Sequence, residues 1–572
     1  MLDRQTGYPS VDRPWLKYYS EEAINDSLPE CTIYEYMVQN NKDYPSDIAI
    51  VYLGRKITYK ELIENIDKAA AAFLKAGVKE KEIVTVALPC IPEALYSVYA
   101  LNKIGAVANM IHPLAGKDET LNYYNEVQSR IAVIFDGAFA TIADDIGKTG
   151  VEKVVVASPA DSLPTALKIA YGLKVKKPNL DGQKFISWKN FIQGGKGTEV
   201  NLVKKDCHDM AIISHTGETT GEPKGCVFSD YNVNAEIWQI VKSMSNNRQE
   251  TMMAVLPPFI NYSLVNCMLE PLSIGLKTVL IPKYEPSQFA HYVKKYKVNH
   301  INSIPPYWEA LLNIPSIEKS DFSNLRYLFY GGEAMPLETE EAVNRILKKC
   351  GAPLKLQKGL GMTEFTSAAT ATYKELDDIE SVGIPLVKSI CKIVDPDDHT
   401  EKRYNEEGEI CISGPTLMKE YYDNKEETDE LIKIHKDGQR WIHTGDLGYI
   451  NDSGEVYITG RIKRIVMTKG NDGQPTKLFP DRIEKAIDSD PTVELSCVIG
   501  VPHKIRINYP KAFVVLKDGI PQSEETKQSI LNSCKSALPD YMVPDEIVFR
   551  TDLPRTSRGK VDYRALETEY SK

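Results

Sequence analysis

The stretch HTGETTGEPKG, residues 215–225, decides how the rest of the chain is interpreted. Its glycines, threonines and proline favour neither helix nor strand, and Lys224 stands near its end. Glycines let a backbone fold closely around an anion, while threonine hydroxyls and a lysine ammonium add hydrogen-bond donors and positive charge. The stretch therefore predicts a loop that holds a polyphosphate. It is not the Walker A pattern, because Gly225 follows the lysine where that pattern requires Ser or Thr.

Strand-like and helical segments alternate on both sides of this loop. The helical pattern at 61–77, for example, is apolar along one face and stops at a glycine. Alternation of this kind, with nearly continuous apolar strands, predicts an α/β fold with buried, largely parallel sheets. The expected strands are 48–53, 83–88, 132–137, 153–158, 252–257, 278–282 and 327–332, and a strand at 210–213 and a helix at 230–241 flank the loop.

The composition and the pattern of the sequence change after Gly460. Residues 461–490 are highly charged, and strand-like runs at 497–502 and 511–519 precede a helix-like segment at 523–538. A chain of 572 residues is also too long for one hydrophobic core. We therefore predict a large N-terminal α/β domain over 1–460, a hinge at 461–464 and a small, mobile α+β domain over 465–572.

Charge and composition exclude some classes of protein. The net charge of −10 disfavours a protein whose main partner is nucleic acid. The ten cysteines form no CxxC pair, which is typical of reduced thiols. With no apolar run of signal-peptide or membrane-span length, a cytoplasmic protein is expected. The segment 162–177 is apolar on one side and lysine-rich on the other, so it is either a solvated surface helix or a peripheral membrane contact.

Further motifs accompany the loop in a fixed order along the chain. Together they resemble the adenylate-forming superfamily, and most closely its AMP-dependent fatty acyl-CoA synthetases. The motifs are ITYKEL (57–62), KIGAVANMIHP (103–113), TTGEPKG (219–225), LPPFINYS (256–263), YGGEAM (330–335), GLGMTE (359–364), GEICISGP (408–415), WIHTGDLG (441–448), GRIKR (460–464), LPDYMVP (538–544) and LPRTSRGKVDYRAL (553–566).

This resemblance implies a two-step reaction. A carboxylate attacks the α-phosphorus of ATP, giving an acyl-adenylate and pyrophosphate, and a thiol then takes the acyl group. The resemblance implies Lys560 as the mobile catalytic lysine, and Thr363 and Glu364 as the pair that binds the α-phosphate and Mg²⁺. It also implies that Asp446 binds the ribose and that the chain turns at Lys463 between the two steps. The nucleotide contacts that it implies are Thr216, Gly217, Thr219, Thr220, Gly221, Lys224, Gly332, Glu333, Ala334, Leu360, Gly361, Asp446 and Arg461.

Three features depart from the family pattern. Glu218 either replaces a glycine of the phosphate loop or, as we prefer, accompanies one inserted residue, with Gly217 in the glycine role and Glu218 pointing outward or toward Mg²⁺. Leu360 replaces a tyrosine that stacks on adenine, which weakens ATP binding by ~0.5–1.5 kcal/mol, by analogy with aromatic pairs. The loop at 469–480 is longer than usual, which affects the expected binding of the thiol.

The acyl pocket is expected to be apolar. Phe259, Ile260, Tyr262 and Gly359 are its implied residues, and Ile260 stands where amino-acid-activating relatives carry an aspartate. A medium- or long-chain fatty acid is therefore preferred over an aryl acid, and an α-amino acid is disfavoured. Coenzyme A is the expected acceptor, with Arg506 and Lys511 as a conceivable site for its 3′-phosphate. Loading of a separate acyl carrier protein, or a non-catalytic binding protein, remain the alternatives.

Overall fold

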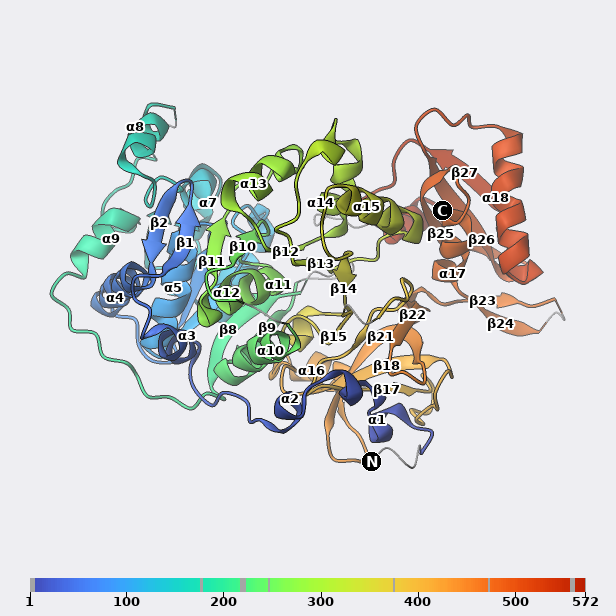
Figure 1. Cartoon of the computed structure of the whole chain (residues 1–572), viewed down its shortest axis with the longest axis horizontal. Coiled ribbons are helices and arrows are strands. Elements are labelled where there is room, and N and C mark those ends of the chain that lie inside the picture. Colours follow the sequence, from blue (N-terminus) through green and yellow to red (C-terminus); the bar gives the residue numbers. More distant parts are fainter. Residues whose placement is uncertain are drawn as a thin grey trace.

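The computed structural model describes residues 6–174, 178–216, 223–244, 247–373, 376–471, 474–555 and 561–570. These residues form a large body and a small domain, which lies at the right of Figure 1 and is coloured orange to red. The large body contains two mostly parallel sheets and a third, antiparallel sheet. The predicted alternation of buried strands with helices is confirmed.

An eight-stranded sheet carries the phosphate-loop motif. It is parallel except at one edge, where β8 pairs antiparallel with β9 and β9 with β19. Its strands, in spatial order, are β19 (Glu420–Tyr421), β9 (Gly225–Ser229), β8 (Met210–His215), β4 (Val107–Met110), β3 (Ile83–Ala87), β5 (Ile131–Phe135), β6 (Lys153–Ala157) and β7 (Phe185–Ser187).

A seven-stranded sheet lies beside it, and the predicted adenine strip follows one of its strands, β13. All of its pairs are parallel except the hairpin of β1 and β2. Its strands, in spatial order, are β14 (Gln357–Lys358), β13 (Tyr327–Tyr330), β12 (His300–Ser303), β10 (Thr251–Ala254), β11 (Lys277–Leu280), β1 (Ile48–Tyr52) and β2 (Arg55–Thr58).

Helices cover both sheets. Helix α5 is buried along its whole length, as expected of a helix enclosed by other elements. In α4, the Thr58 hydroxyl caps the N-terminus by accepting a hydrogen bond from the Glu61 N–H (3.2 Å), and Gly77 follows the helix with a φ of +87°. The helices of the large body are α1 (Pro9–Asp12), α2 (Glu21–Asn25), α3 (Ile33–Asn41), α4 (Tyr59–Lys75), α5 (Pro92–Lys103), α6 (Lys117–Val127), α7 (Phe139–Ile146), α8 (Thr165–Lys174), α9 (Trp188–Gly194), α10 (Asp230–Ser243), α11 (Asn261–Ser263), α12 (Glu270–Ile274), α13 (Phe289–Tyr296), α14 (Pro305–Glu309), α15 (Leu337–Lys349) and α16 (Lys425–Leu431).

The antiparallel sheet is the part of the large body from which the chain enters the small domain. Its last hairpin, β21 with β22, runs directly into the predicted hinge, where a short 3₁₀ helix, η8 (Ile462–Arg464), follows β22. Its strands are β17 (Ile390–Val394), β18 (Gly408–Ser413), β21 (Arg440–Ile450), β20 (Ile432–Ile434) and β22 (Val456–Arg461), and the small pair β15 (Thr370–Ala371) with β16 (Ile384–Pro385) lies nearby.

The small domain is a three-stranded sheet covered by helices on both faces. One face packs against α17 and α18 through residues such as Ile483 and Ile530, and the other packs against α19 through Leu566. Strand β26 pairs antiparallel with β25 and parallel with β27. The elements are β25 (Val493–His503), β26 (Ile507–Leu516), β27 (Glu546–Arg550), α17 (Pro480–Asp488), α18 (Glu524–Ala537) and α19 (Tyr563–Tyr570).

The long loop at 469–480 contains regular structure. Strands β23 (Val466–Lys469) and β24 (Pro475–Leu478) form an antiparallel hairpin in which Lys469 lies opposite Pro475. Figure 1 shows this hairpin projecting from the small domain. The predicted long loop is therefore largely a β-hairpin, and residues 472–473 lie outside the described residues.

Two expectations about local structure need correction or qualification. The phosphate loop does not lead directly into a helix, because Gly225–Ser229 forms a strand that pairs back onto β8 before α10 begins. The lysine-rich segment does contain a helix, α8, which projects from the body in Figure 1 and leaves the Ile169 side chain 64% exposed. Among the described residues no helix is both long and apolar enough to cross a membrane.

Candidate active site

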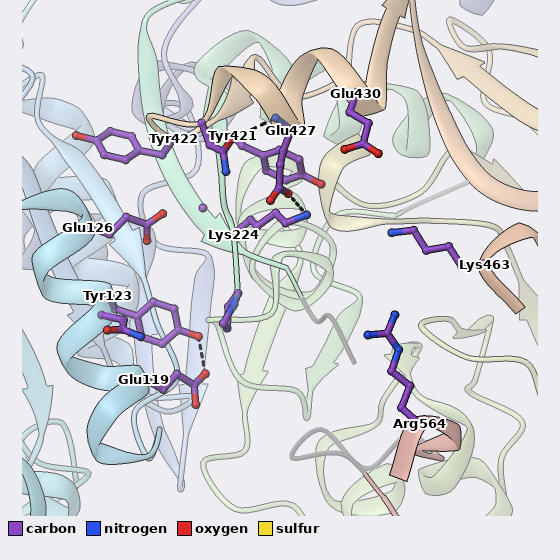
Figure 2. A pocket seen from close by; sticks show the side chains of 14 residues that line it. Glu119, Tyr123, Glu126, Lys224, Tyr421, Tyr422, Glu427, Glu430, Lys463 and Arg564 are labelled. Carbon is purple, nitrogen blue, oxygen red and sulfur yellow. Dashed lines mark hydrogen bonds and ion pairs between the residues drawn. The ribbon is translucent and has the colours of Figure 1, made fainter. Parts of the chain in front are cut away.

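A cavity of about 700 Å³ opens between the large body and the small domain. It contains Lys224 of the phosphate-loop motif and Lys463 of the predicted hinge, so the structure brings these two predicted residues together. Figure 2 shows the side chains of Lys463 and Arg564 pointing toward Lys224 from the side of the small domain. The remaining labelled side chains come from α6, β19, α16 and the residue after β19, and they are Glu119, Tyr123, Glu126, Tyr421, Tyr422, Glu427 and Glu430.

Two hydrogen bonds hold the two ends of the phosphate loop together. The Thr216 N–H donates to the Lys224 carbonyl (2.9 Å), and the Lys224 N–H donates to the Thr216 hydroxyl oxygen (3.1 Å). The loop itself, with the predicted contacts Gly217, Thr219, Thr220 and Gly221 and with Glu218, lies outside the described residues. The structure therefore defines where the loop starts and ends.

The Lys224 ammonium lies among side chains that the sequence analysis did not identify. It forms an ion pair with Glu427 of α16, and it lies 5.1 Å from the centre of the Tyr421 ring. The Tyr421 hydroxyl in turn donates to the Glu364 carboxylate (2.7 Å). These contacts connect the phosphate-loop lysine to the predicted Mg²⁺ ligand. No sequence signal marks Glu427, because its segment KEETDEL looks like an ordinary solvated helix.

The GLGMTE motif forms a tight backbone turn. A Cβ atom at Gly359 would lie 2.0 Å from the Thr370 carbonyl oxygen, and one at Gly361 would lie 2.3 Å from that of Ser367, so both positions require glycine. Leu360, between them, is buried. The 3₁₀ turn η7 (Thr363–Phe365) follows, so Thr363 and Glu364 stand at the start of the turn, with Thr363 half-buried and Glu364 buried.

The predicted adenine strip follows β13 at the carboxyl end of the parallel sheet, which is where open α/β sheets bind ligands. Gly332 has a φ of +90°, a conformation that favours glycine. Gly332 and Ala334 are exposed and Glu333 is half-buried. Burial raises the pKa of the neighbouring Glu309, the Glu333 charge raises it further, and Arg555 opposes both effects. Arg555 of the small domain is therefore within electrostatic reach of Glu309.

The predicted ribose and nucleotide residues form one ion pair. Asp446 and Arg461 lie opposite each other in the β21–β22 hairpin, and the Arg461 Nε atom is 2.7 Å from the Asp446 carboxylate. Asp446 is buried, and its N–H donates to the Thr444 hydroxyl oxygen (3.1 Å). The Arg461 N–H donates to the Asp481 carboxylate (2.6 Å) at the start of α17, so this hairpin also contacts the small domain.

The predicted acyl-pocket residues lie between the two parallel sheets. The Phe259 ring packs on His112 with ring centres 4.3 Å apart, Ile260 is half-buried, and the Tyr262 hydroxyl is buried. Asn261, which the analysis did not single out, accepts a hydrogen bond from Ser214 (3.0 Å) and donates to the Thr366 carbonyl. Asn261 thus joins the end of β8 to the segment after the GLGMTE motif.

Two further predictions concern the small domain. Lys560 lies outside the described residues, but Arg555 and Val561 form an antiparallel bridge that holds together the ends of its loop. The conceivable 3′-phosphate site is not supported, because Arg506 is bound to Asp545 (2.8 Å) and Lys511 to Glu546 (3.0 Å). Lys511 is also buried.

Two family models of known proteins match this chain. Residues 37–422 match the family described as AMP-binding enzyme, and residues 482–560 match the AMP-binding enzyme C-terminal domain. The chain belongs to the AMP-binding enzyme family. The predicted membership of the adenylate-forming superfamily is thereby confirmed.

The relatives of this AMP-binding enzyme are named for different acids. A long-chain-fatty-acid–CoA ligase of Bacillus subtilis is 27% identical over 97% of this chain and 98% of its own length. A probable 4-coumarate–CoA ligase of Dictyostelium discoideum is 27% identical over 95% of this chain and 96% of its own. The predicted enzyme class, an AMP-forming acid–thiol ligase, is the class for which these relatives are named.

Solved structures confirm the predicted fold. The crystal structure of ATP-bound MatB from Rhodopseudomonas palustris matches with a TM-score of 0.80 at 23% identity, covering 95% of this chain and 99% of that one. An anthranilate–CoA ligase bound to anthranoyl-AMP matches with a TM-score of 0.78 at 21% identity, covering 95% and 98%. At these identities the likeness establishes a large N-terminal and a small C-terminal domain of this fold.

Proposed function

We propose that this AMP-binding enzyme activates a hydrophobic carboxylic acid with ATP, releases pyrophosphate, and transfers the acyl group to coenzyme A. The observation that carries the proposal is the chain of contacts from Lys224 through Tyr421 to Glu364, which joins two predicted phosphate-binding elements at the cavity between the domains. Phosphoryl chemistry of this kind depends on positioning and on stabilising negative charge.

Each predicted residue has a role in that reaction. Asp446 accepts hydrogen bonds from the ribose hydroxyls, and the adenine lies along Gly332, Glu333 and Ala334. Lys224 and the loop before it hold the phosphates. Thr363 donates to an α-phosphate oxygen. The carboxylate attacks the α-phosphorus, and the pyrophosphate leaves with the electron pair of the broken bond.

Positive charge is needed where this negative charge grows. Lys560 would bring an ammonium group to the reacting carboxylate and phosphate oxygens. The electrostatic influence of Arg555 on Glu309, which also senses Glu333, supports this role, because the loop of Lys560 starts at Arg555. Mg²⁺ fits the site, since the Glu364 carboxylate and the ATP phosphates are the hard oxygen donors that it prefers, and it would neutralise phosphate charge when bound.

For the acid, a medium- or long-chain fatty acid is the first choice. The fatty-acid–CoA ligase of Bacillus subtilis and the apolar Phe259 and Ile260 support it, and each buried CH₂ group would add about 0.8 kcal/mol of binding free energy. The 4-coumarate–CoA ligase relative keeps aryl acids as the alternative. Coenzyme A is the acceptor for which these relatives are named, and a cytoplasmic location is part of the same proposal.

The test is pyrophosphate release with MgATP across a panel of carboxylic acids, with and without coenzyme A, together with identification of the thioester. We expect acid-dependent release that coenzyme A stimulates. Lys560→Ala should abolish it, whereas Lys504→Ala, at an exposed lysine of the same domain, should not. Release that coenzyme A does not stimulate would indicate a carrier protein as acceptor. No release from a folded protein with any acid would refute the proposal.

A further inference from the structure

Three buried polar side chains and one buried tyrosine hydroxyl lie beneath the candidate active site, where an apolar acyl pocket was expected. They are Glu236 of α10, Tyr262 of α11, Asn266 of the π-helical segment η3 (Leu264–Leu269) and Glu270 of α12, and we call them the polar cluster. Glu236 is 0% exposed and Glu270 is 3% exposed. Charged side chains are almost never buried this deeply without a partner.

The polar cluster lies against the nucleotide-binding motifs. One Glu236 oxygen accepts a hydrogen bond from the Ala368 N–H (2.7 Å), and Ala368 forms a bridge with Gly361 of the GLGMTE motif. At the other end, the Tyr262 ring lies close to Gly331, beside the adenine strip. A Cβ atom placed on Gly331 would be 3.9 Å from this ring. The cluster is therefore next to the position where the acid must meet ATP.

Each member of the cluster has an oxygen atom without a hydrogen-bond partner. Within the described part of the chain these are Glu236 Oε2, Tyr262 Oη, Asn266 Oδ1 and Glu270 Oε2. Buried polar groups are hydrogen-bonded in most proteins, so unsatisfied atoms gathered at one place require an explanation. Ordered water is one explanation, and a bound ligand is the other.

The charge balance of the cluster favours a ligand with hydrogen-bond donors. Burial raises the pKa of Glu236 to about 8, although hydrogen bonds from the Ala368 N–H and the Asn266 side chain oppose this rise. Burial raises the pKa of Glu270 well above its usual range, and the charge of Glu236 raises it further. In the described structure neither carboxyl group forms an ion pair with Lys, Arg or His. Three of the four unsatisfied atoms are carboxyl or amide oxygens, so a ligand group that donates hydrogen bonds, and above all one that also carries positive charge, would complement the cluster.

We propose that the polar cluster binds an amino or hydroxyl group of the acid substrate, so that the enzyme prefers acids that carry such a donor away from the reacting carboxylate. This inference rests on the proposed function and narrows its substrate class. It also locates the donor-binding site on α10 and α12, instead of the motif position occupied by Ile260. An amine would bind as an ammonium and convert the glutamates to carboxylates, and a hydroxyl would donate to them.

The test compares matched acids. Straight-chain acids of increasing length would each be supplied in plain, ω-hydroxy and ω-amino form, together with a phenolic aryl acid and its unsubstituted counterpart. For the wild-type enzyme we expect kcat/KM to be about 100-fold or more higher for the best donor-bearing acid than for its plain partner, because a site built for a donor rejects analogues that lack it. The amino and hydroxy series show which donor is recognised.

Variants assign the preference to the cluster. Glu270→Met keeps the volume and removes the acceptors, so the preference should disappear through a higher KM for the donor-bearing acid, while plain acids and ATP keep their KM values. Glu270→Gln and Glu236→Gln provide less disruptive versions. Glu93→Gln is the matched control, because Glu93 is equally buried, is hydrogen-bonded to Ser162 (2.6 Å), and lies in α5.

The outcomes separate this inference from the proposed function. If the wild type turns over plain and donor-bearing acids equally, the inference is wrong and the CoA ligase stands, with water filling the cluster. A preference that survives in Glu270→Met, or that disappears equally in Glu93→Gln, also overturns it. If the folded wild type activates no acid at all, both proposals fail.

Discussion

The ion pair between Lys224 and Glu427 leads to a prediction about ATP affinity. In the proposed function the Lys224 ammonium binds the phosphates of ATP, and in this structure it is bound to the Glu427 carboxylate. The two anions would compete for the same positive charge. Glu427→Gln removes one competitor while keeping the shape of the side chain, so we expect ATP to bind more tightly to this variant.

The size of the effect follows from the exposure of the pair. The Lys224 side chain is 23% exposed and that of Glu427 is 39% exposed, so water and salt screen their attraction. Ion pairs of this kind contribute about 0.2–1 kcal/mol. Releasing Lys224 should therefore lower the dissociation constant of MgATP by a factor of roughly 1.4 to 5. The difference should become smaller as salt is added.

The assay is titration of MgATP into the enzyme without acid or coenzyme A, so that only binding is measured. Glu430→Gln is the matched control, because Glu430 lies on the same helix and lines the same cavity. Within the described residues Glu430 forms no ion pair. Its variant removes the general repulsion of phosphate but leaves Lys224 bound, so it should change the affinity less than Glu427→Gln does.

A weaker affinity would refute this reasoning. If the dissociation constant rises in Glu427→Gln, the glutamate holds the lysine in place for phosphate and does not compete with it. Equal gains in both variants would mean that the negative charge of the cavity matters, and not the pair. Either result would assign Glu427 a different role.

Four further predictions test other parts of the structure. Gly361→Ala should lower both melting temperature and activity, because its Cβ would lie 2.3 Å from the Ser367 carbonyl oxygen; unchanged melting would contradict the tight turn. Asp446→Asn should weaken MgATP binding about 10-fold or more, since charge-assisted hydrogen bonds contribute ~1.5–3 kcal/mol. As a control, the wild type and this variant should bind 2′,3′-dideoxy-ATP, which has no ribose hydroxyls, with similar affinity. Leu360→Tyr should tighten ATP binding roughly 2- to 10-fold by restoring a stacking ring, and no gain would mean that adenine does not lie on this residue. Burial raises the pKa of Glu93 from 4.5 to about 8, so the folded state holds this proton more tightly and stability falls as pH rises between these values; Glu93→Gln should flatten the melting temperature over that range.

Much of the fold could be predicted from local sequence patterns. Apolar runs such as 83–88 and 153–158 form strands because they are buried on both faces, and the stripe in 61–77 forms a helix because Thr58 and Gly77 mark its ends. Strand β9 was missed because GCVFS is short and begins with a glycine, and only its pairing with β8 makes it a strand. That pairing is a tertiary contact.

The site residues that lie in motifs could be predicted from the sequence, whereas the residues that surround them could not. Asp446 and Arg461 could be identified from their motifs, and the structure pairs them across one hairpin. Glu427 could not, because it meets Lys224 only when α16 packs against β19, the strand that pairs with β9. Glu236 and Glu270 occupy helical positions that look polar in the sequence, and their burial depends on the helices and sheets that surround them. The sequence specifies the chemistry of a motif, whereas its electrostatic surroundings arise from distant segments.

The contacts around the predicted hinge define which bonds can turn. Arg464 is bound to Glu484 through two hydrogen bonds (2.6 and 2.7 Å) and to the Val498 carbonyl (3.0 Å), so it moves with the small domain. Arg461 is bound to Asp446 and therefore stays with the large body. A rotation of the small domain must then occur between these arginines, at Ile462 and the exposed Lys463, and it must break the hydrogen bond from Arg461 to Asp481. Arg461 is bound to Asp446, the proposed ribose ligand, so a nucleotide that binds Asp446 would also affect the residue next to the pivot. This arrangement supports the proposal that Lys463 is the hinge, and it links nucleotide binding to the orientation of the domain that carries Lys560.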